Sequence, residues 1–218
     1  MNERVLRPPP SAPGNRQRQR THTALLAAGQ RLFAERPVEG VTIDDIVDAA
    51  EVGKGSFYNH FPDKSAFAKA IFELVQGDVE FHIYSANQEI ADPPSRIARA
   101  LCVVMRYALD HPDRVQTMLN LAERHTDPEA PLNAGVSDDV RRGMDLGRLG
   151  AIGIEAGVLV VLGLTMVSVQ HIMSGEASGS ARDLAAAMAA AALRALGLDV
   201  AEAAAIGRDA ADGVLGGR

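Results

Sequence analysis

Two short apolar segments joined by a glycine-containing turn lie within residues 42–61, and they constrain the fold more than any other feature of the chain. Thr42 is a residue type that caps helix N-termini, and Asp45 follows it three residues later, as a shorter variant of the acid in a capping box. The turn at 51–53 contains Gly53, which can supply a positive φ. Two helices joined by a tight turn predict a helix-turn-helix, whose second helix can enter the major groove of DNA.

The second segment, from about Lys54 to Phe61, divides its side chains by chemistry. Phe57 and Phe61 are four residues apart and share one face, which we expect to pack on the preceding helices. The other side chains point elsewhere and provide a cation, hydroxyls, an amide and an imidazole, which suit phosphates and base edges. Gly55 lets the backbone approach DNA closely. The candidate DNA-binding residues, with two flanking phosphate contacts included, are Thr42, Lys54, Gly55, Ser56, Tyr58, Asn59, His60 and Lys64.

A solvated turn between core helices is the alternative interpretation of this segment. Two observations favour a binding partner. Glycine in a helix costs about 1 kcal/mol relative to alanine, and an exposed tyrosine beside Asn59 and His60 is an unusual choice for a surface without a partner. The amide of Asn59 can pair bidentately with adenine, so we expect this residue to influence which DNA sequence is preferred.

The rest of the chain repeats apolar residues at helical spacing, and no run alternates as a strand would. A chain of 218 residues suits one large domain, or a small domain and a larger one. The sequence therefore predicts an all-α fold. Further helices are expected from Thr21 to about Pro37, after Asp63, after Pro93-Pro94, after Pro112, over 138–149, over 152–173 and over 183–196, with a loop at 126–137. Residues 197–218 are compatible with another short helix that has a frayed end.

Composition limits the cellular setting. The single cysteine, Cys102, permits no internal disulfide and is expected in a helix as a small apolar residue. The N-terminus lacks the apolar region of a signal peptide. The longest apolar run, 156–169, is shorter than the roughly 20 residues of a membrane span and favours a helix buried in protein. We expect a soluble, cytoplasmic protein that makes no membrane contact.

The net charge of −6 argues mildly against nucleic acid, but the distribution of charge matters more than its sum. Residues 1–20 hold five arginines against one glutamate, a local surplus of four positive charges. Residues 1–18 are rich in proline and arginine and predict a flexible arm.

Catalysis finds no support in the sequence. The six histidines are dispersed, with no His-x-x-x-His pair, no cysteine cluster and no glycine-rich phosphate loop after a strand. We therefore expect no metal, no cofactor and no enzyme activity.

The run AEVGKGSFYNHFPDKSAFAKAI, preceded by a Thr-x-x-x-Ile-x-x-x-Ala pattern, resembles the signature of the TetR (tetracycline repressor) family of bacterial transcription regulators. The resemblance covers about residues 20–75 and is most specific at 54–64. It implies an N-terminal three-helix DNA-binding domain, a linking fourth helix and a C-terminal helical domain for ligand binding and dimerisation. The expected divisions are the arm at 1–18, the helix-turn-helix domain at 19–64, the effector-binding and dimerisation domain at 65–200, and a C-terminal tail at 201–218.

The resemblance also implies a four-helix dimer interface made by the last two long helices. Their apolar and small residues suit close helix packing, although a purely internal core would have the same composition. A two-fold dimer places its recognition helices about 34 Å apart and requires a palindromic operator. The expected dimer residues are Ile154, Val158, Val161, Leu162, Thr165, Val169, Ile172, Ala185, Met188 and Ala192.

An effector pocket is expected among the fourth to eighth helices. Methionine adapts to varied apolar shapes, and histidine can orient a polar group of a ligand. Each of these residues is also compatible with an ordinary core or surface role. The candidates are Phe81, Tyr84, Met105, Met118, Leu121, His125, Met166 and His171.

The leading hypothesis is a dimeric transcription regulator, a repressor that a small-molecule effector releases from a palindromic operator on double-stranded DNA. One alternative is a helical protein-interaction module that has lost DNA binding, which the intact Lys54, Tyr58, His60 and Lys64 disfavour. An enzyme is a third hypothesis without supporting residues. The sequence names neither the effector nor the operator.

Overall fold

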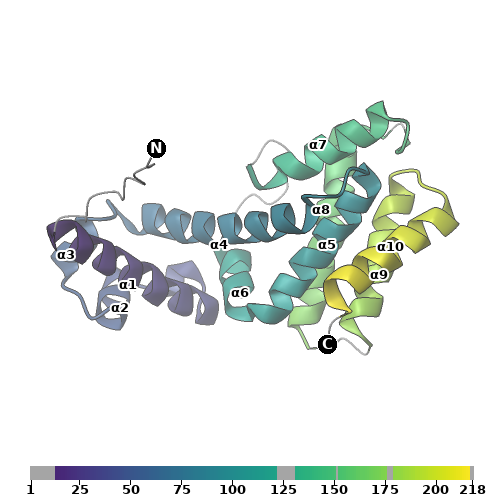
Figure 1. Cartoon of the computed structure of the whole chain (residues 1–218). Coiled ribbons are helices and arrows are strands. Elements are labelled where there is room, and N and C mark those ends of the chain that lie inside the picture. The colour runs from purple at the N-terminus through teal and green to yellow at the C-terminus, as the bar shows by residue number, and fades with distance from the viewer. Residues whose placement is uncertain (1–12, 122–130, 151, 176–178, 217–218) are drawn as a thin grey trace, which may run out of the picture. The chain divides into compact units, whose positions relative to one another are not determined.

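The computed structural model describes residues 13–121, 131–150, 152–175 and 179–216. Helices account for nearly all of these residues, and no strand occurs among them, as the sequence predicts (Figure 1). The chain divides into two compact units, 1–71 and 72–218. The elements are α1 Pro13–Glu35, the 3-10 turn η1 Val38–Gly40, α2 Ile43–Ala49, α3 Lys54–Tyr58, α4 Lys64–Asn87, α5 Pro93–Asp110, α6 Pro112–Leu121, α7 Pro131–Asp145, α8 Ile154–Met173, α9 Ala181–Ala195 and α10 Val200–Leu215.

Local caps begin the helices of the first unit where the sequence predicts. The Thr42 hydroxyl accepts a hydrogen bond from the Asp45 backbone N–H at 3.1 Å, and an Asp45 carboxylate oxygen accepts one from the Thr42 N–H at 2.9 Å. This reciprocal pair is a complete capping box for α2. At the start of α4, the Asp63 carboxylate accepts a hydrogen bond from the Ala66 N–H at 2.8 Å.

An aromatic core fixes the first unit. Phe33, Phe57, Phe61 and Phe67 are all buried. Phe67 of α4 lies at the centre, with its ring centroid 5.3 Å from that of Phe57, 4.9 Å from that of Phe61 and 6.0 Å from that of Phe33. These spacings suit edge-to-face contacts between aromatic rings. The expectation that Phe57 and Phe61 share a buried face is confirmed.

The turn between α2 and α3 has a different backbone from the one expected. Gly53 has a φ of −73° and serves as the N-cap of α3. The left-handed residue is Glu51, with a φ of 55°. The expectation for Gly53 was therefore wrong, because the chain reverses two residues earlier, where α2 ends.

Helix α5 is the centre of the second unit, and α7, α8, α9 and α10 all pack on it (Figure 1). Asp92 caps α5 by accepting a hydrogen bond from the Ser95 N–H at 3.2 Å. Pro93 and Pro94 form the first turn of the helix, a position that tolerates proline because no intrahelical donor is lost there. The prolines thus start α5, whereas the sequence had indicated only a separator between two helices.

Two segments expected to be irregular are helical, and the C-terminal segment is more helical than expected. Helix α1 begins at Pro13, so it includes residues 13–18 of the predicted arm. Residues 131–137 of the predicted loop form the start of α7. The predicted tail contains α10, which packs on α9 and α5 and buries alanines and a glycine. A short helix with a frayed end was one expectation for residues 197–218, and α10 is longer than that, with 16 residues.

Helices α9 and α10 approach each other closely at Gly207. A Cβ atom placed there would lie 2.6 Å from the Ala186 carbonyl oxygen and 3.1 Å from the Ala190 nitrogen, whereas one at Gly77 of α4 would meet nothing within 4 Å. We predict that Gly207→Ala lowers the thermal midpoint of unfolding, at a cost of about 1–3 kcal/mol from overpacking. Gly77→Ala should raise the midpoint by removing a flexible residue from a helix, a gain of about 0.5–1 kcal/mol. Calorimetry of both variants checks this, and shifts of the same sign would contradict it.

Candidate DNA-binding interface

Helix α3 presents its polar side chains to solvent while Phe57 holds it to the core. The Tyr58 side chain is 51% exposed, and Gly55 and Asn59 are also exposed. A Cβ atom at Gly55 would meet nothing within 4 Å. The absence of a side chain at Gly55 is therefore not required by packing within the protein, and it leaves the backbone of α3 open to a partner.

A polar hollow lies beside α3. It has a volume of about 570 Å³ and is bordered by the polar side chains Gln17, Arg18, Thr21, Ser56, Asn59 and His60. The first three belong to α1, which the sequence did not place at the site. The cluster of arginines in residues 1–20 was the signal available, but it had been assigned to a flexible arm. The structure instead brings Arg18 next to three predicted DNA-binding residues.

His60 is half-buried at the rim of this hollow. Its ring centroid lies 5.4 Å from that of His22, which itself stacks on Phe61 at 5.3 Å. Burial lowers the pKa of the His60 imidazole, and the neighbouring His22 and Arg18 lower it further. The neutral imidazole, with one donor and one acceptor, is thus the favoured form near neutral pH.

Lys54 pairs with Asp44 of α2, with 2.7 Å between the ammonium nitrogen and a carboxylate oxygen. The hydrogen bond to Asp44 raises the pKa of Lys54, so the cation is retained. Both side chains are more than half exposed, and such a surface pair is weak enough to exchange for a phosphate contact.

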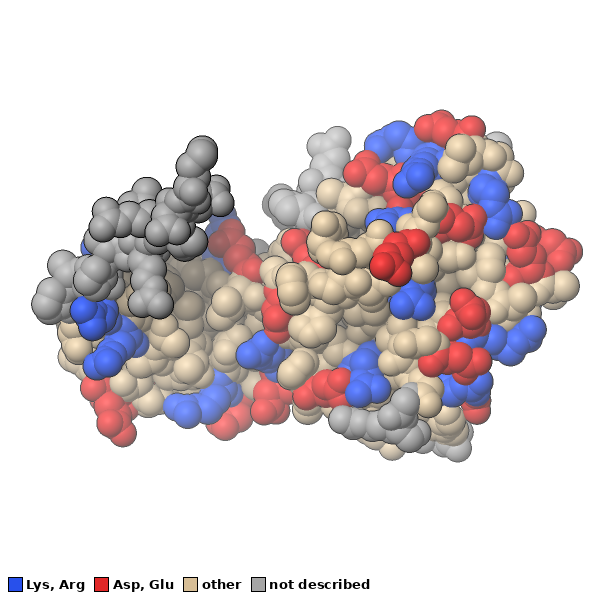
Figure 2. Space-filling view, viewed as in Figure 1, with Lys and Arg blue, Asp and Glu red and all other residues tan. Residues whose placement is uncertain are grey.

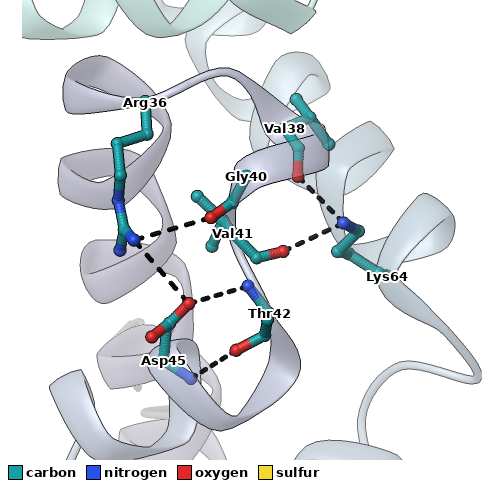
Figure 3. Close-up of polar contacts among 7 residues, drawn as sticks. All are labelled: Arg36, Val38, Gly40, Val41, Thr42, Asp45 and Lys64. Carbon is teal, nitrogen blue, oxygen red and sulfur yellow. Dashed lines mark hydrogen bonds and ion pairs between the residues drawn. The ribbon is translucent and has the colours of Figure 1, made fainter.

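Arg36 and Lys64 lie on either side of the chain segment that leads into α2, and Thr42 is at the end of this segment (Figure 3). The Lys64 ammonium donates to the backbone carbonyl oxygens of Val38 and Val41, at 2.9 Å each. Lys64 is half-buried, unlike the exposed Lys54. The predicted phosphate contact at Lys64 therefore already has protein partners, which the sequence could not indicate because they lie more than twenty residues away.

Charge is distributed unequally between the two units. Residues 1–71 contain ten Lys and Arg against eight Asp and Glu, a net of +2, which leaves −8 for residues 72–218. Figure 2 shows acidic side chains spread over the visible face of the second unit. The acidic surplus of the chain thus belongs to residues 72–218 and not to the helix-turn-helix unit.

The second unit contains an apolar cavity of about 360 Å³ among α4, α5, α6, α7 and α8. Its position agrees with the region expected to hold an effector pocket. Met118 and Met166, two of the predicted effector residues, line it. Asn133 and Thr165 contribute polar groups to an otherwise apolar lining, which contains no charged side chain among the described residues.

The other predicted effector residues do not line this cavity. Phe81, Tyr84 and His171 are exposed, while Met105 is fully buried in the core. Leu121 is half-buried at the end of α6, and His125 lies outside the described residues. The sequence assigned α4 an inward face that the structure turns outward, because α4 carries apolar residues on more than one side.

The predicted dimer residues fall into two groups. Five are fully buried within the protomer and cannot reach a partner: Val158, Val161, Val169, Ala185 and Ala192. The other five are only half-buried: Ile154, Leu162, Thr165, Ile172 and Met188. For the first group the prediction needs correction, because a helix that is apolar all round gives no sign in the sequence of which face is internal.

Helix α8 nevertheless has an exposed apolar stripe. Leu159 is 40% exposed, Val167 is 59% exposed, and Gly163 lies between them at four-residue spacing. By length and composition α8 is the one described helix that could cross a membrane, and only 28% of its apolar window is buried. The stripe is thus an apolar surface that the described part of the protomer leaves exposed.

The described residues contain no cluster of three or more His, Cys, Asp or Glu that could hold a metal ion. Cys102 is buried, and burial raises the pKa of its thiol to about 12. Such a thiol is unreactive near neutral pH.

Comparison with known proteins identifies the family. The profile described as "Bacterial regulatory proteins, tetR family" matches residues 25–71, and that described as "Tetracyclin repressor-like, C-terminal domain" matches residues 92–209. The second match alone covers more than half of the chain. The chain belongs to the TetR family. The resemblance read from the sequence is thereby confirmed.

Two curated relatives, both named HTH-type transcriptional repressors, match over part of the chain. The transcriptional repressor DhaR of Mycobacterium sp. (strain GP1) is 40% identical over 72 residues, which are 33% of this chain and 36% of DhaR. The transcriptional repressor NemR of Escherichia coli (strain K12) is 42% identical over 53 residues, 24% of this chain and 27% of NemR. The chain thus matches only about a third of the length of these curated relatives.

A solved structure extends the comparison over both units. The crystal structure of RolR in complex with resorcinol superposes with a TM-score of 0.67 at 26% identity, covering 88% of this chain and 95% of RolR. The all-α architecture of the described residues is therefore similar to that of RolR in both units.

We predict that the first unit loses stability as the pH falls below about 6.5, the ordinary pKa of histidine. The unfolded chain binds the His60 proton more readily than the folded chain, since the folded-state pKa is lowered. The stability that His60 contributes is present above that pH and is lost as the pH falls through the folded pKa. Thermal midpoints at pH 7.5 and 5.5 should therefore differ less for His60→Gln than for the wild type. Equal differences would contradict the prediction, and His22→Gln should raise the pKa of His60 measured by NMR.

Proposed function

We propose that this chain is a cytoplasmic, DNA-binding transcription regulator that acts as a homodimer. The observation that carries the proposal is helix α3, which Phe57 anchors in the core while Tyr58, Asn59 and Gly55 remain exposed. Membership of the TetR family supports the same conclusion. A repressor is favoured because DhaR and NemR are both named transcriptional repressors.

Each exposed group has a role in this proposal. Tyr58, Ser56 and Lys54 contact phosphates through hydroxyls and an ammonium group, and these contacts set the register of the protein on the duplex. Asn59 contacts a base edge. The polar hollow beside α3 adds Arg18, whose cation faces the same surface and increases the electrostatic component of binding.

The exposed stripe of α8 supports the homodimer. Leu159, Gly163 and Val167 share one helix face, and a second copy of the same face would cover all three. The absence of a side chain at Gly163 allows close approach, since a Cβ atom there would meet nothing within 4 Å. A two-fold axis at this face would repeat the recognition helix and require a palindromic operator.

The cavity supports regulation by a small, uncharged effector. Its lining is apolar except for Asn133 and Thr165, so a ligand with a charged group would be desolvated there without compensation. RolR has a similar architecture and was crystallised with resorcinol, which is an uncharged ligand. We therefore propose a neutral aromatic or aliphatic molecule with one or two hydroxyl groups, which releases the repressor from DNA by binding one dimer geometry more tightly than another.

A protein-interaction module that has lost DNA binding is the rival proposal. An apolar protein interface would depend little on salt, whereas DNA binding weakens steeply as salt rises, because the release of condensed counterions becomes less favourable. The exposed polar surface of α3 favours the DNA-binding protein.

Fluorescence anisotropy with duplex DNA from the region upstream of the protein's own gene tests the function. We expect wild-type protein to bind and Tyr58→Ala to bind roughly tenfold more weakly, a loss of about 1.4 kcal/mol. Tyr84→Ala is the matched control, because Tyr84 is an exposed tyrosine of the second unit. Resorcinol and related neutral phenols should dissociate the protein from the DNA, while benzoate, which carries a charge, should not. Absence of binding at low salt would refute the regulator, and binding without release by any neutral phenol would refute only the proposed effector class.

We predict that Val167→Glu converts the dimer to a monomer, because it places a charge in an apolar interface. Ala205→Glu adds the same charge to an exposed position of α10 and should leave the dimer intact. Sedimentation equilibrium of the two variants gives the oligomeric state. A dimeric Val167→Glu protein would exclude the α8 stripe as the interface.

A further inference from the structure

The first residue of α4 makes an unusual set of contacts for a surface lysine. The Lys64 ammonium lies 2.9 Å from the carbonyl oxygen of Val38 and 2.9 Å from that of Val41, so two of its three hydrogens are used (Figure 3). Both carbonyls belong to the short segment that connects α1 to α2. The same ammonium therefore binds the first residue of η1 and the residue that follows it. No side chain caps the start of η1.

The segment 38–41, which Lys64 binds, leads directly into the N-terminus of α2. Val41 is fully buried and immediately precedes Thr42, whose hydroxyl and backbone N–H form the capping box with Asp45. Arg36 approaches the same segment from α1, with its guanidinium 3.5 Å from the Gly40 carbonyl and 3.9 Å from the Asp45 carboxylate. The position of the α2 N-terminus thus depends on Lys64 on one side and on Arg36 on the other.

Removing the ammonium would take from the buried Val41 its lysine donor, whereas the half-buried Val38 carbonyl would keep only the Val41 backbone N–H, at 3.2 Å. An unsatisfied buried polar group costs more than the net gain of the hydrogen bond it lost. The segment would then shift to recover partners, and the α2 N-terminus would move with it. A lysine devoted to a phosphate would not need such a position, as the exposed Lys54 shows.

We propose that Lys64 is a positioning residue for DNA binding, which acts through the carbonyls of Val38 and Val41 to hold Thr42 and the N-terminus of α2 in place, and that it does not itself contact a phosphate. The proposal rests on the function proposed above. It assigns to Lys64 a role different from the phosphate contact implied by the family resemblance. It also links α4, the helix that continues into the second unit, to the capping residue of α2.

The salt dependence of operator binding separates the two roles. The slope of log K against log salt is negative. A lost phosphate contact makes it less steep by about 0.9, whereas a lost positioning contact weakens binding without changing the slope. We expect Lys64→Met to weaken binding about tenfold at an unchanged slope. Lys54→Ala is the control for an ionic contact and should make the slope less steep by about 0.9. Lys69→Ala removes the same charge from an exposed position of α4 and should do neither.

Lys64→Arg provides a second discrimination. Arginine binds a phosphate at least as well as lysine. Its planar guanidinium has donors in fixed directions, however, and cannot replace a compact ammonium that lies between two carbonyl oxygens. Under our proposal Lys64→Arg binds DNA as weakly as Lys64→Met. Full affinity in Lys64→Arg, together with a less steep slope in Lys64→Met, would overturn the proposal in favour of a phosphate contact.

Hydrogen exchange gives a readout that does not depend on DNA. In free Lys64→Met protein, the amides of Thr42 and Asp45 should exchange at least tenfold faster than in the wild type, while amides of the second unit remain unchanged. Unchanged exchange at Thr42 and Asp45 would overturn the positioning role even if the wild-type protein bound no DNA. Failure of the wild type to bind DNA, in contrast, would refute the regulator proposed above and leave the exchange measurement to decide on Lys64.

Discussion

The packing of Phe57 and Phe61 on Phe67 is the interaction on which the first unit depends. Helix α3 has only five residues, and helices of that length are not stable by themselves in water. Its orientation must therefore come from tertiary contacts, and the two phenylalanines supply them. Because Phe57 is fixed inward, Tyr58 is directed outward by the geometry of the helix. The same aromatic contacts thus determine both the core and the exposed surface.

Helix α4 has polar contacts in both units. At its start, Lys64 binds the carbonyls that precede α2. Further along, Asp78 accepts a hydrogen bond from the Tyr107 hydroxyl at 2.7 Å and pairs with Arg114, which joins α4 to α5 and α6. Polar contacts of defined geometry at two points of one helix allow a movement at one point to reach the other.

The parts of the fold that the sequence predicted share a strong local signal. The capping box of Thr42, the cap at Asp63 and the four-residue spacing of Phe57 and Phe61 each depend on neighbours in the chain, and each is present. The parts that it missed depend on distant residues. The partners of Lys64 are 23 and 26 residues away, and Arg18 reaches the site only because α1 packs beside α3. Burial of Val158 and exposure of Val167 on the same apolar helix were likewise undetermined until the surrounding helices were placed.

The proposed effector cavity and the proposed dimer face use the same helix. Leu159, Gly163 and Val167, which form the exposed stripe of α8, also line the cavity. A ligand that orders these side chains therefore changes the surface offered to a second copy, and a second copy changes the walls offered to the ligand. By linkage the two effects must be equal in free energy. Under the proposed function, binding of an effector and the geometry of the dimer would then be coupled at α8 itself, in addition to any coupling through α4, whose Val79 and Ile83 line the same cavity.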